Sequence, residues 1–139
     1  MKFLPVLFAV FLLPLIAQAQ SPVGTWKNEK ATFEIFDQGG KLFGKILTLK
    51  EPNDKAGKAK VDFRNPDASK QAVPLVGLVF LKNFVPAGSG RWDKGTIYDP
   101  ENGKTYSSYM QMTGNDAIEV RGFLGISLLG RSQNWTRMK

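Results

Sequence analysis

Residues 95–113, GTIYDPENGKTYSSYMQMT, decide the fold of this chain. From 105 to 113, one set of alternate positions carries Tyr106 and Met110, while the intervening positions are mostly polar. This period of two is typical of a β-strand with one face in a core. Between 99 and 103 the residues are Asp-Pro-Glu-Asn-Gly, in which Pro100 favours a turn and Gly103 tolerates a positive φ. The stretch therefore predicts two antiparallel strands joined by a tight turn.

The same alternation recurs in short runs along the chain, broken by Gly, Asn, Asp and Pro, and the three-to-four spacing of helices is almost absent. We expect strands at residues 24–28, 31–37, 42–49, 76–84, 95–98, 105–113, 117–124 and 133–138. Closure into a barrel is the surest way to remove exposed sheet edges. The predicted fold class is all-β, a single antiparallel up-and-down β-barrel of about eight strands. Such a small barrel either holds one small ligand or is filled by its own side chains.

The first 19 residues predict a secretory signal peptide. Lys2 precedes an apolar run from residue 3 to residue 16, and Ala17-Gln18-Ala19 supplies the small residues of a cleavage site before Gln20. The apolar run is shorter than the roughly 20 residues that span a membrane. We therefore expect a soluble protein, periplasmic or secreted, in which residues 20–139 form one barrel domain.

Composition narrows the chemistry. The chain has no Cys and no His, which excludes disulfides, a Ser-His-Asp triad, a Cys-His nucleophile and the usual zinc site. A pair of carboxylates, as in glycosidases, remains available, but no spacing singles one out. We therefore expect neither an enzyme nor a cofactor. The formal net charge of +7 is scattered along the chain, so it indicates weak attraction to polyanions and no nucleic-acid site.

Residues 50–74 have no apolar period and form a long polar connection of the kind that often serves as a binding loop or lid. Asp62, Asn65 and Asp67 within it offer oxygen ligands that suit Ca²⁺, but Asn65-Pro66-Asp67 fits a rigid turn better, and we expect no metal.

If the barrel binds a ligand, we expect it to enter beneath this connection. The predicted binding residues are polar side chains at the rim and apolar ones below, namely Arg64, Asn65, Asp67, Phe80, Tyr106 and Met110. Arg64 and Lys70 would then face an anionic headgroup. The expected partner is a fatty acid, a lipid or another small amphiphile, without stable membrane insertion.

Gly24-x-Trp26 in the first strand resembles the lipocalin signature, in which a tryptophan near the closed end of the barrel packs under a cation from the last strand. Arg131 or Arg137, on either side of Trp135, would supply that cation. Trp26, Arg131 and Trp135 are therefore assigned structural roles.

A longer series of motifs is more specific. In order along the chain these are Asn65-Pro66-Asp67, PLVGL at 74–78, WxxGxIYDPENGKTY at 92–106, VRGFLG at 120–125 and LGRSQxWxR at 129–137. Together they resemble the bacterial secreted family called domain of unknown function 2147, over residues 23–137. The resemblance implies a lipocalin-like (calycin) barrel and no established activity. A ligand-binding barrel and a solid-core structural or interaction protein of the cell envelope both remain open, and the oligomeric state is not determined by the sequence.

Overall fold

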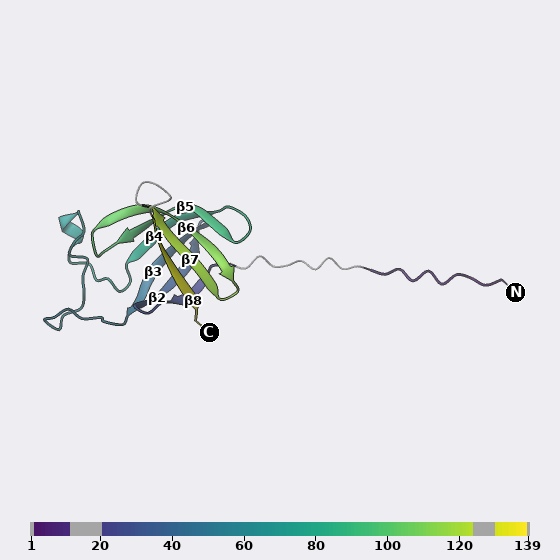
Figure 1. The fold of residues 1–139 in the computed structure, drawn as a ribbon, viewed down its shortest axis with the longest axis horizontal. Coiled ribbons are helices and arrows are strands. Elements are labelled where there is room, and N and C mark those ends of the chain that lie inside the picture. Colours follow the sequence, from purple (N-terminus) through teal and green to yellow (C-terminus); the bar gives the residue numbers. More distant parts are fainter. Residues whose placement is uncertain (1, 12–20, 124–129, 139) are drawn as a thin grey trace.

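The computed structural model describes residues 2–11, 21–123 and 130–138 and shows one closed, antiparallel, up-and-down barrel (Figure 1). Each strand pairs with the next along the chain, and the last pairs with the first. The strands are β1 (Gly24–Lys27), β2 (Ala31–Gln38), β3 (Lys41–Leu49), β4 (Val79–Pro86), β5 (Arg91–Asp99), β6 (Lys104–Gly114), β7 (Ala117–Phe123) and β8 (Arg131–Arg137), with a short 3₁₀ helix, η1 (Ala68–Lys70). The predicted fold class is confirmed.

Strand boundaries differ from the prediction where the alternation of the sequence is interrupted. β4 begins at Val79, because Gly77 has a φ of 92° and Leu78 donates to the Leu75 carbonyl in a turn. β5 begins at Arg91, four residues earlier than expected. A bulge with Lys94 at a φ of 60° interrupts the alternation of inward and outward side chains, so the start of this strand is not visible in the sequence pattern. Leu124, the expected end of β7, and the predicted cleavage site at residues 17–20 lie outside the described residues.

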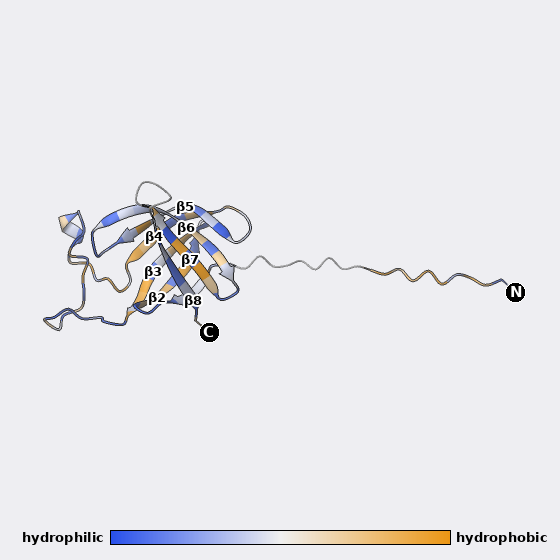
Figure 2. Ribbon diagram, viewed as in Figure 1, coloured by the Kyte–Doolittle hydropathy of each residue, from blue (hydrophilic) through white to orange (hydrophobic). Residues whose placement is uncertain are grey.

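The connections lie alternately at the two ends of the barrel. The β2–β3, β4–β5 and β6–β7 turns lie at one end, called the base here. The β1–β2 turn, the β5–β6 turn and the long β3–β4 connection lie at the other end, called the mouth. Figure 1 shows the β3–β4 connection, with η1, projecting from the barrel, and Figure 2 shows that it is mostly hydrophilic, whereas hydrophobic residues recur along the strands. Among the described residues no helix is long and apolar enough to cross a membrane.

The base half of the barrel is filled by side chains. The largest fully buried side chains there come from six strands and are Trp26, Ile35, Leu42, Leu81, Phe84, Met110 and Ile118. Small residues make room for them: the ring of Phe84 occupies the space that a side chain at Gly95 would need. This dense packing supplies stability that no disulfide provides in this chain.

Arg137 closes the base. Its guanidinium lies 4.4 Å from the centre of the Trp26 ring and donates to the carbonyls of Ser21 and Val23 at 2.8 and 2.9 Å. It also forms an ion pair with Asp116 at 3.6 Å. The assignment of Arg131 to this role is wrong, because Arg131 begins β8 at the mouth, whereas Arg137 is paired with Trp26 across β1 and β8.

Gly24 of the Gly-x-Trp motif has a steric role in the same contact. A Cβ atom at Gly24 would lie 2.7 Å from a terminal nitrogen of Arg137, and the φ of Gly24 is 142°. Both facts favour glycine, because only glycine lacks a side chain and adopts this φ without strain. The motif therefore leaves space for the cation that covers Trp26.

Replacing Arg137 by Gln should lower the free energy of unfolding by about 2–4 kcal/mol, because it removes the cation over Trp26, three charged hydrogen bonds and the ion pair with Asp116. Arg131→Gln is the matched control and should change it by less than about 0.5 kcal/mol, since its side chain is exposed. Urea unfolding followed by tryptophan fluorescence measures both. Equal stability of the two variants would contradict the role assigned to Arg137.

Candidate ligand-binding cavity

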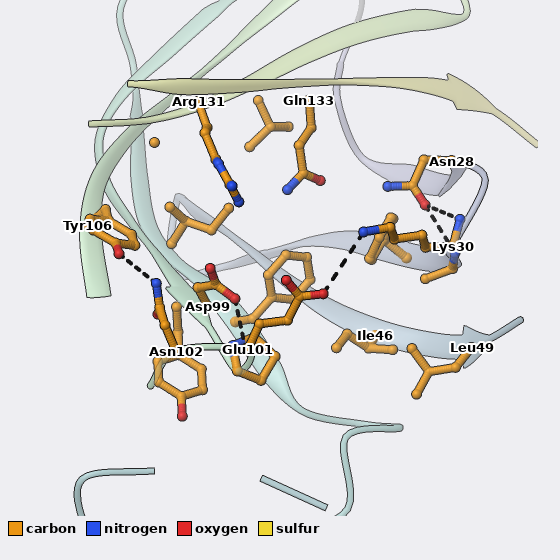
Figure 3. Close-up of a pocket in the computed structure, with 18 residues that line it drawn as sticks. Asn28, Lys30, Ile46, Leu49, Asp99, Glu101, Asn102, Tyr106, Arg131 and Gln133 are labelled. Carbon is orange, nitrogen blue, oxygen red and sulfur yellow. Dashed lines mark hydrogen bonds and ion pairs between the residues drawn. The ribbon is translucent and has the colours of Figure 1, made fainter. Parts of the chain in front are cut away.

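The mouth half of the barrel is hollow. A cavity of about 410 Å³ opens there, within the range of small-molecule sites (Figure 3). The residues that line it are Asn28, Lys30, Ala31, Phe33, Ile46, Leu49, Phe80, Ile97, Tyr98, Asp99, Pro100, Glu101, Asn102, Tyr106, Val120, Gly122, Arg131 and Gln133. The interior is therefore packed at the base and open at the mouth, which the sequence had left undecided.

The floor of the cavity is aromatic. Phe33 and Phe80 line it with ring centres 5.3 Å apart, and Phe33 also stacks on Trp135 at 4.2 Å and an interplanar angle of 15°. Trp135 is 1% exposed and belongs to the core beneath the floor. An apolar group in the cavity would contact Phe33 and so change the surroundings of the indole.

The rim of the cavity is polar and holds charges of both signs. Lys30, from the β1–β2 turn, approaches Glu101, from the β5–β6 turn, at 3.9 Å, and both side chains are 73% exposed. Asp99 accepts from the backbone N–H of Glu101 at 2.9 Å, which holds the β5–β6 turn. An amphipathic molecule would meet apolar walls below and these groups at the opening.

The inward face of β8 changes character along the strand. Trp135 faces the core, so the alternation of the strand places Gln133 and Arg131 on the same inward side, nearer the mouth. Figure 3 shows both side chains pointing from β8 into the cavity, opposite Asp99 and Glu101. Residues 99–106 and 131–133, far apart in the sequence, therefore meet at one opening.

Of the six predicted binding residues, the structure brings two, Phe80 and Tyr106, to the cavity. Met110 shares the inward face of β6 with Tyr106, but it lies about 13 Å farther towards the base, is 0% exposed and does not line the cavity. The predicted contact of Met110 with a ligand therefore finds no support in this cavity. Its place in the core reflects the taper from an open mouth to a packed base.

The predicted rim residues Arg64, Asn65 and Asp67 do not line the cavity either. Arg64 lies over the ring of Phe63 at 5.1 Å. Asn65 and Asp67 are engaged within the connection itself: Asn65 donates to Asp62 at 2.8 Å and accepts from the Asp67 backbone N–H at 2.8 Å. The Asp67 carboxylate caps η1 by accepting hydrogen bonds from Ser69, and these bonds from Ser69 lower the pKa of Asp67. The segment thus forms the rigid turn that was expected.

The long connection is anchored to the barrel by a buried carboxylate. Asp62 is 1% exposed and accepts from the Tyr98 hydroxyl of β5 at 2.6 Å. A second anchor lies at the β5–β6 turn, where the backbone of Arg64 packs so closely on Gly103 that no side chain would fit there. Residues 62–64 therefore hold the connection beside the mouth, although their side chains do not line the cavity.

Lys30, Asp99, Glu101 and Gln133 are not among the residues that the sequence predicts for the site, and Arg131 is predicted to have a structural role. All five line the cavity. Four of them lie within the two motifs, at 92–106 and 129–137, that carry the family resemblance. Membership of these motifs is therefore a signal in the sequence that could have identified them. Only the closed barrel places the two motifs opposite each other.

Residues 24–137 match the model of a family described as "Uncharacterized protein conserved in bacteria (DUF2147)". The chain belongs to this family. The match runs from the first residue of β1 to the last residue of β8, so the DUF2147 domain is the whole barrel. The resemblance inferred from the sequence motifs is confirmed.

The DUF2147 barrel is similar to a solved structure from Helicobacter pylori, protein HP1028, which is described as belonging to the lipocalin family. The TM-score is 0.77 at 21% sequence identity, over 86% of this chain and 84% of that chain. This similarity establishes a lipocalin-like fold. No curated protein matches the chain.

Tyr98→Phe should destabilise the protein by about 1.5–3 kcal/mol at neutral pH, because it removes a hydrogen bond to the buried Asp62 carboxylate. Tyr106→Phe is the control, since its hydroxyl bonds only to the exposed Asn102 among the described contacts. Its effect should stay below about 1 kcal/mol. Chemical unfolding measures both, and a Tyr98→Phe variant as stable as the control would contradict the anchor.

The same anchor predicts a pH dependence. Burial and the hydrogen bond to Asp62 raise the pKa of Tyr98 from 10.0 to about 12. The folded protein therefore holds this proton more tightly than the unfolded chain. The resulting stability is complete below pH 10 and is lost as the pH rises towards 12. The difference in unfolding free energy between the parent and Tyr98→Phe should accordingly shrink over this range.

Proposed function

We propose that this DUF2147 protein is an exported, non-enzymatic barrel of the periplasm or the extracellular space that binds one small hydrophobic or amphipathic molecule. A fatty acid or another small lipid-derived amphiphile fits this description. The observation that carries the proposal is the cavity of about 410 Å³, with its aromatic floor and polar rim.

The distribution of packing supports binding over a purely structural role. The base half is filled and closed by Arg137, so the barrel does not need its mouth half empty for stability. Phe33 and Phe80 nevertheless stand at the bottom of an accessible cavity. Each of these two side chains keeps about 6% of its surface exposed, and an apolar group in the cavity would bury that remainder, which is a stabilising contribution.

Ala31→Leu should abolish or strongly weaken binding, because it places a larger side chain in the wall of the cavity. We expect decanoate to change the fluorescence of the parent protein saturably, through Phe33 and Trp135, and at least tenfold more of it to be needed for the variant. Ala87→Leu is the matched control: Ala87 is exposed in the β4–β5 turn at the base, so binding should be unchanged.

The alternative is a solid-core structural or interaction protein of the cell envelope. It predicts no saturable response to decanoate, decanol or decyltrimethylammonium from a folded parent protein, or a response that Ala31→Leu leaves unchanged. Native mass spectrometry of the protein purified from its own host adds an independent readout, because a bound small molecule increases the mass by a fixed amount.

The predicted leader has its own test. Protein recovered after export should have the intact mass of a chain that begins at Gln20, and it should remain in the soluble fraction after a salt wash. A mass that includes residues 1–19, or stable association with membranes, would contradict the proposed export as a soluble protein.

A further inference from the structure

The cavity contains a set of hydrogen-bond donors whose direction is determined by their neighbours. Gln133 accepts from the Trp135 indole N–H through Oε1 at 3.1 Å. An indole N–H can only donate, so this contact fixes which end of the Gln133 amide is oxygen. The amide NH₂ is therefore the end left for the cavity, and Figure 3 shows Gln133 directed into it beside Arg131.

Tyr106 is oriented in a similar way on the opposite wall. Asn102 accepts from the backbone N–H of Lys104 through Oδ1 at 2.9 Å, which assigns its Nδ2 as the donor to the Tyr106 oxygen at 2.8 Å. The Tyr106 hydroxyl thus accepts from Asn102, and its own hydrogen remains available to donate. Tyr106 lines the cavity, so this hydrogen is a second oriented donor.

Arg131 supplies the charge. Its backbone pairs with Gly122 of β7, but its side chain makes no hydrogen bond, ion pair or ring contact with any residue in the described ranges 2–11, 21–123 and 130–138. The other basic residue of the rim, Lys30, already faces Glu101 at 3.9 Å. Arg131 therefore brings five N–H groups, without a partner among the described residues, to the inward side of β8, next to the Gln133 amide.

Asp99 is the opposing charge at this opening. One of its carboxylate oxygens accepts from the Glu101 backbone N–H, so Asp99 holds the turn. It forms no ion pair with Arg131 within 4.0 Å, although both line the cavity. The negative charge of Asp99 weakens the binding of an anion by Arg131 but does not abolish it. This opposition makes Asp99 a sensitive reporter of the charge of the ligand.

We infer that Arg131 and Gln133 form the site for a carboxylate at the polar end of the ligand, whose apolar part lies on Phe33 and Phe80. A guanidinium matches the two oxygens of a carboxylate with parallel hydrogen bonds. This inference rests on the proposed function, because it assigns the polar end of a molecule bound in the same cavity. It moves the recognition of an anion from the predicted Arg64 and Lys70 to the last strand.

Three probes with one alkyl chain separate the contributions of charge and apolar contact: decanoate, decanol and decyltrimethylammonium. The parent protein should bind decanoate most tightly. Arg131→Gln should weaken decanoate binding about ten- to a hundredfold, as expected for losing charged hydrogen bonds, and change decanol binding less than about twofold. Arg131→Lys should lie between, since it keeps the charge and loses the paired geometry.

Asp99→Asn provides the reciprocal test. It should strengthen decanoate binding, weaken decyltrimethylammonium binding and leave decanol unchanged. Lys82→Gln controls for net charge, because Lys82 is exposed on β4 and does not line the cavity, and it should change none of the three. Circular dichroism and the urea midpoint confirm that each variant is folded.

Two failures are distinguishable. If the parent binds the probes in the cavity but Arg131→Gln affects decanoate and decanol equally, or neither, the carboxylate site is wrong and the proposed function stands. If the folded parent binds none of the three, or binds them equally well after Ala31→Leu, the proposed function and this inference both fail.

Discussion

The pairing of β1 with β8 is the constraint on which the rest of the structure depends. It closes the sheet, removes the free edges and gives all eight strands a common interior. The contact is short, with Trp26 opposite Arg137 and Lys27 opposite Thr136. Arg137 reinforces it by covering the Trp26 ring and by donating to two carbonyls ahead of β1. A single side chain thus secures the first strand, the last strand and the base.

Closure at the base is what allows the mouth to stay hollow. Because the buried side chains around Trp26 and Phe84 stabilise one half of the barrel, the other half can contain a cavity that Phe33 and Phe80 line. β8 serves both halves, with Arg137 at the base and Arg131 at the mouth. The residue of β8 that stabilises the fold is therefore separate from the residue proposed to recognise a ligand. Substitutions at the mouth should accordingly have little effect on the stability of the fold.

The strands were largely predictable because each depends on a local pattern. A period of two and turn residues such as Pro100 and Gly103 are properties of neighbouring residues. The largest boundary errors, at the starts of β4 and β5, fall where Gly77 and the bulge at Lys94 interrupt the pattern. The cavity was only partly predictable. Phe80 and Tyr106 lie in strands near the mouth, whereas Arg64, Asn65 and Asp67 belong to a polar connection whose own hydrogen bonds engage them.

The sequence by itself determined the class of fold, the order of the strands and the absence of histidine and cysteine chemistry, because these follow from composition and short-range pattern. Only the tertiary structure decided what the two arginines of the last strand do. They share one face of β8, six residues and about 20 Å apart. Their surroundings come from β1 at the base and from the β5–β6 turn at the mouth. Those neighbours are distant in the sequence, and closure of the barrel brings them together.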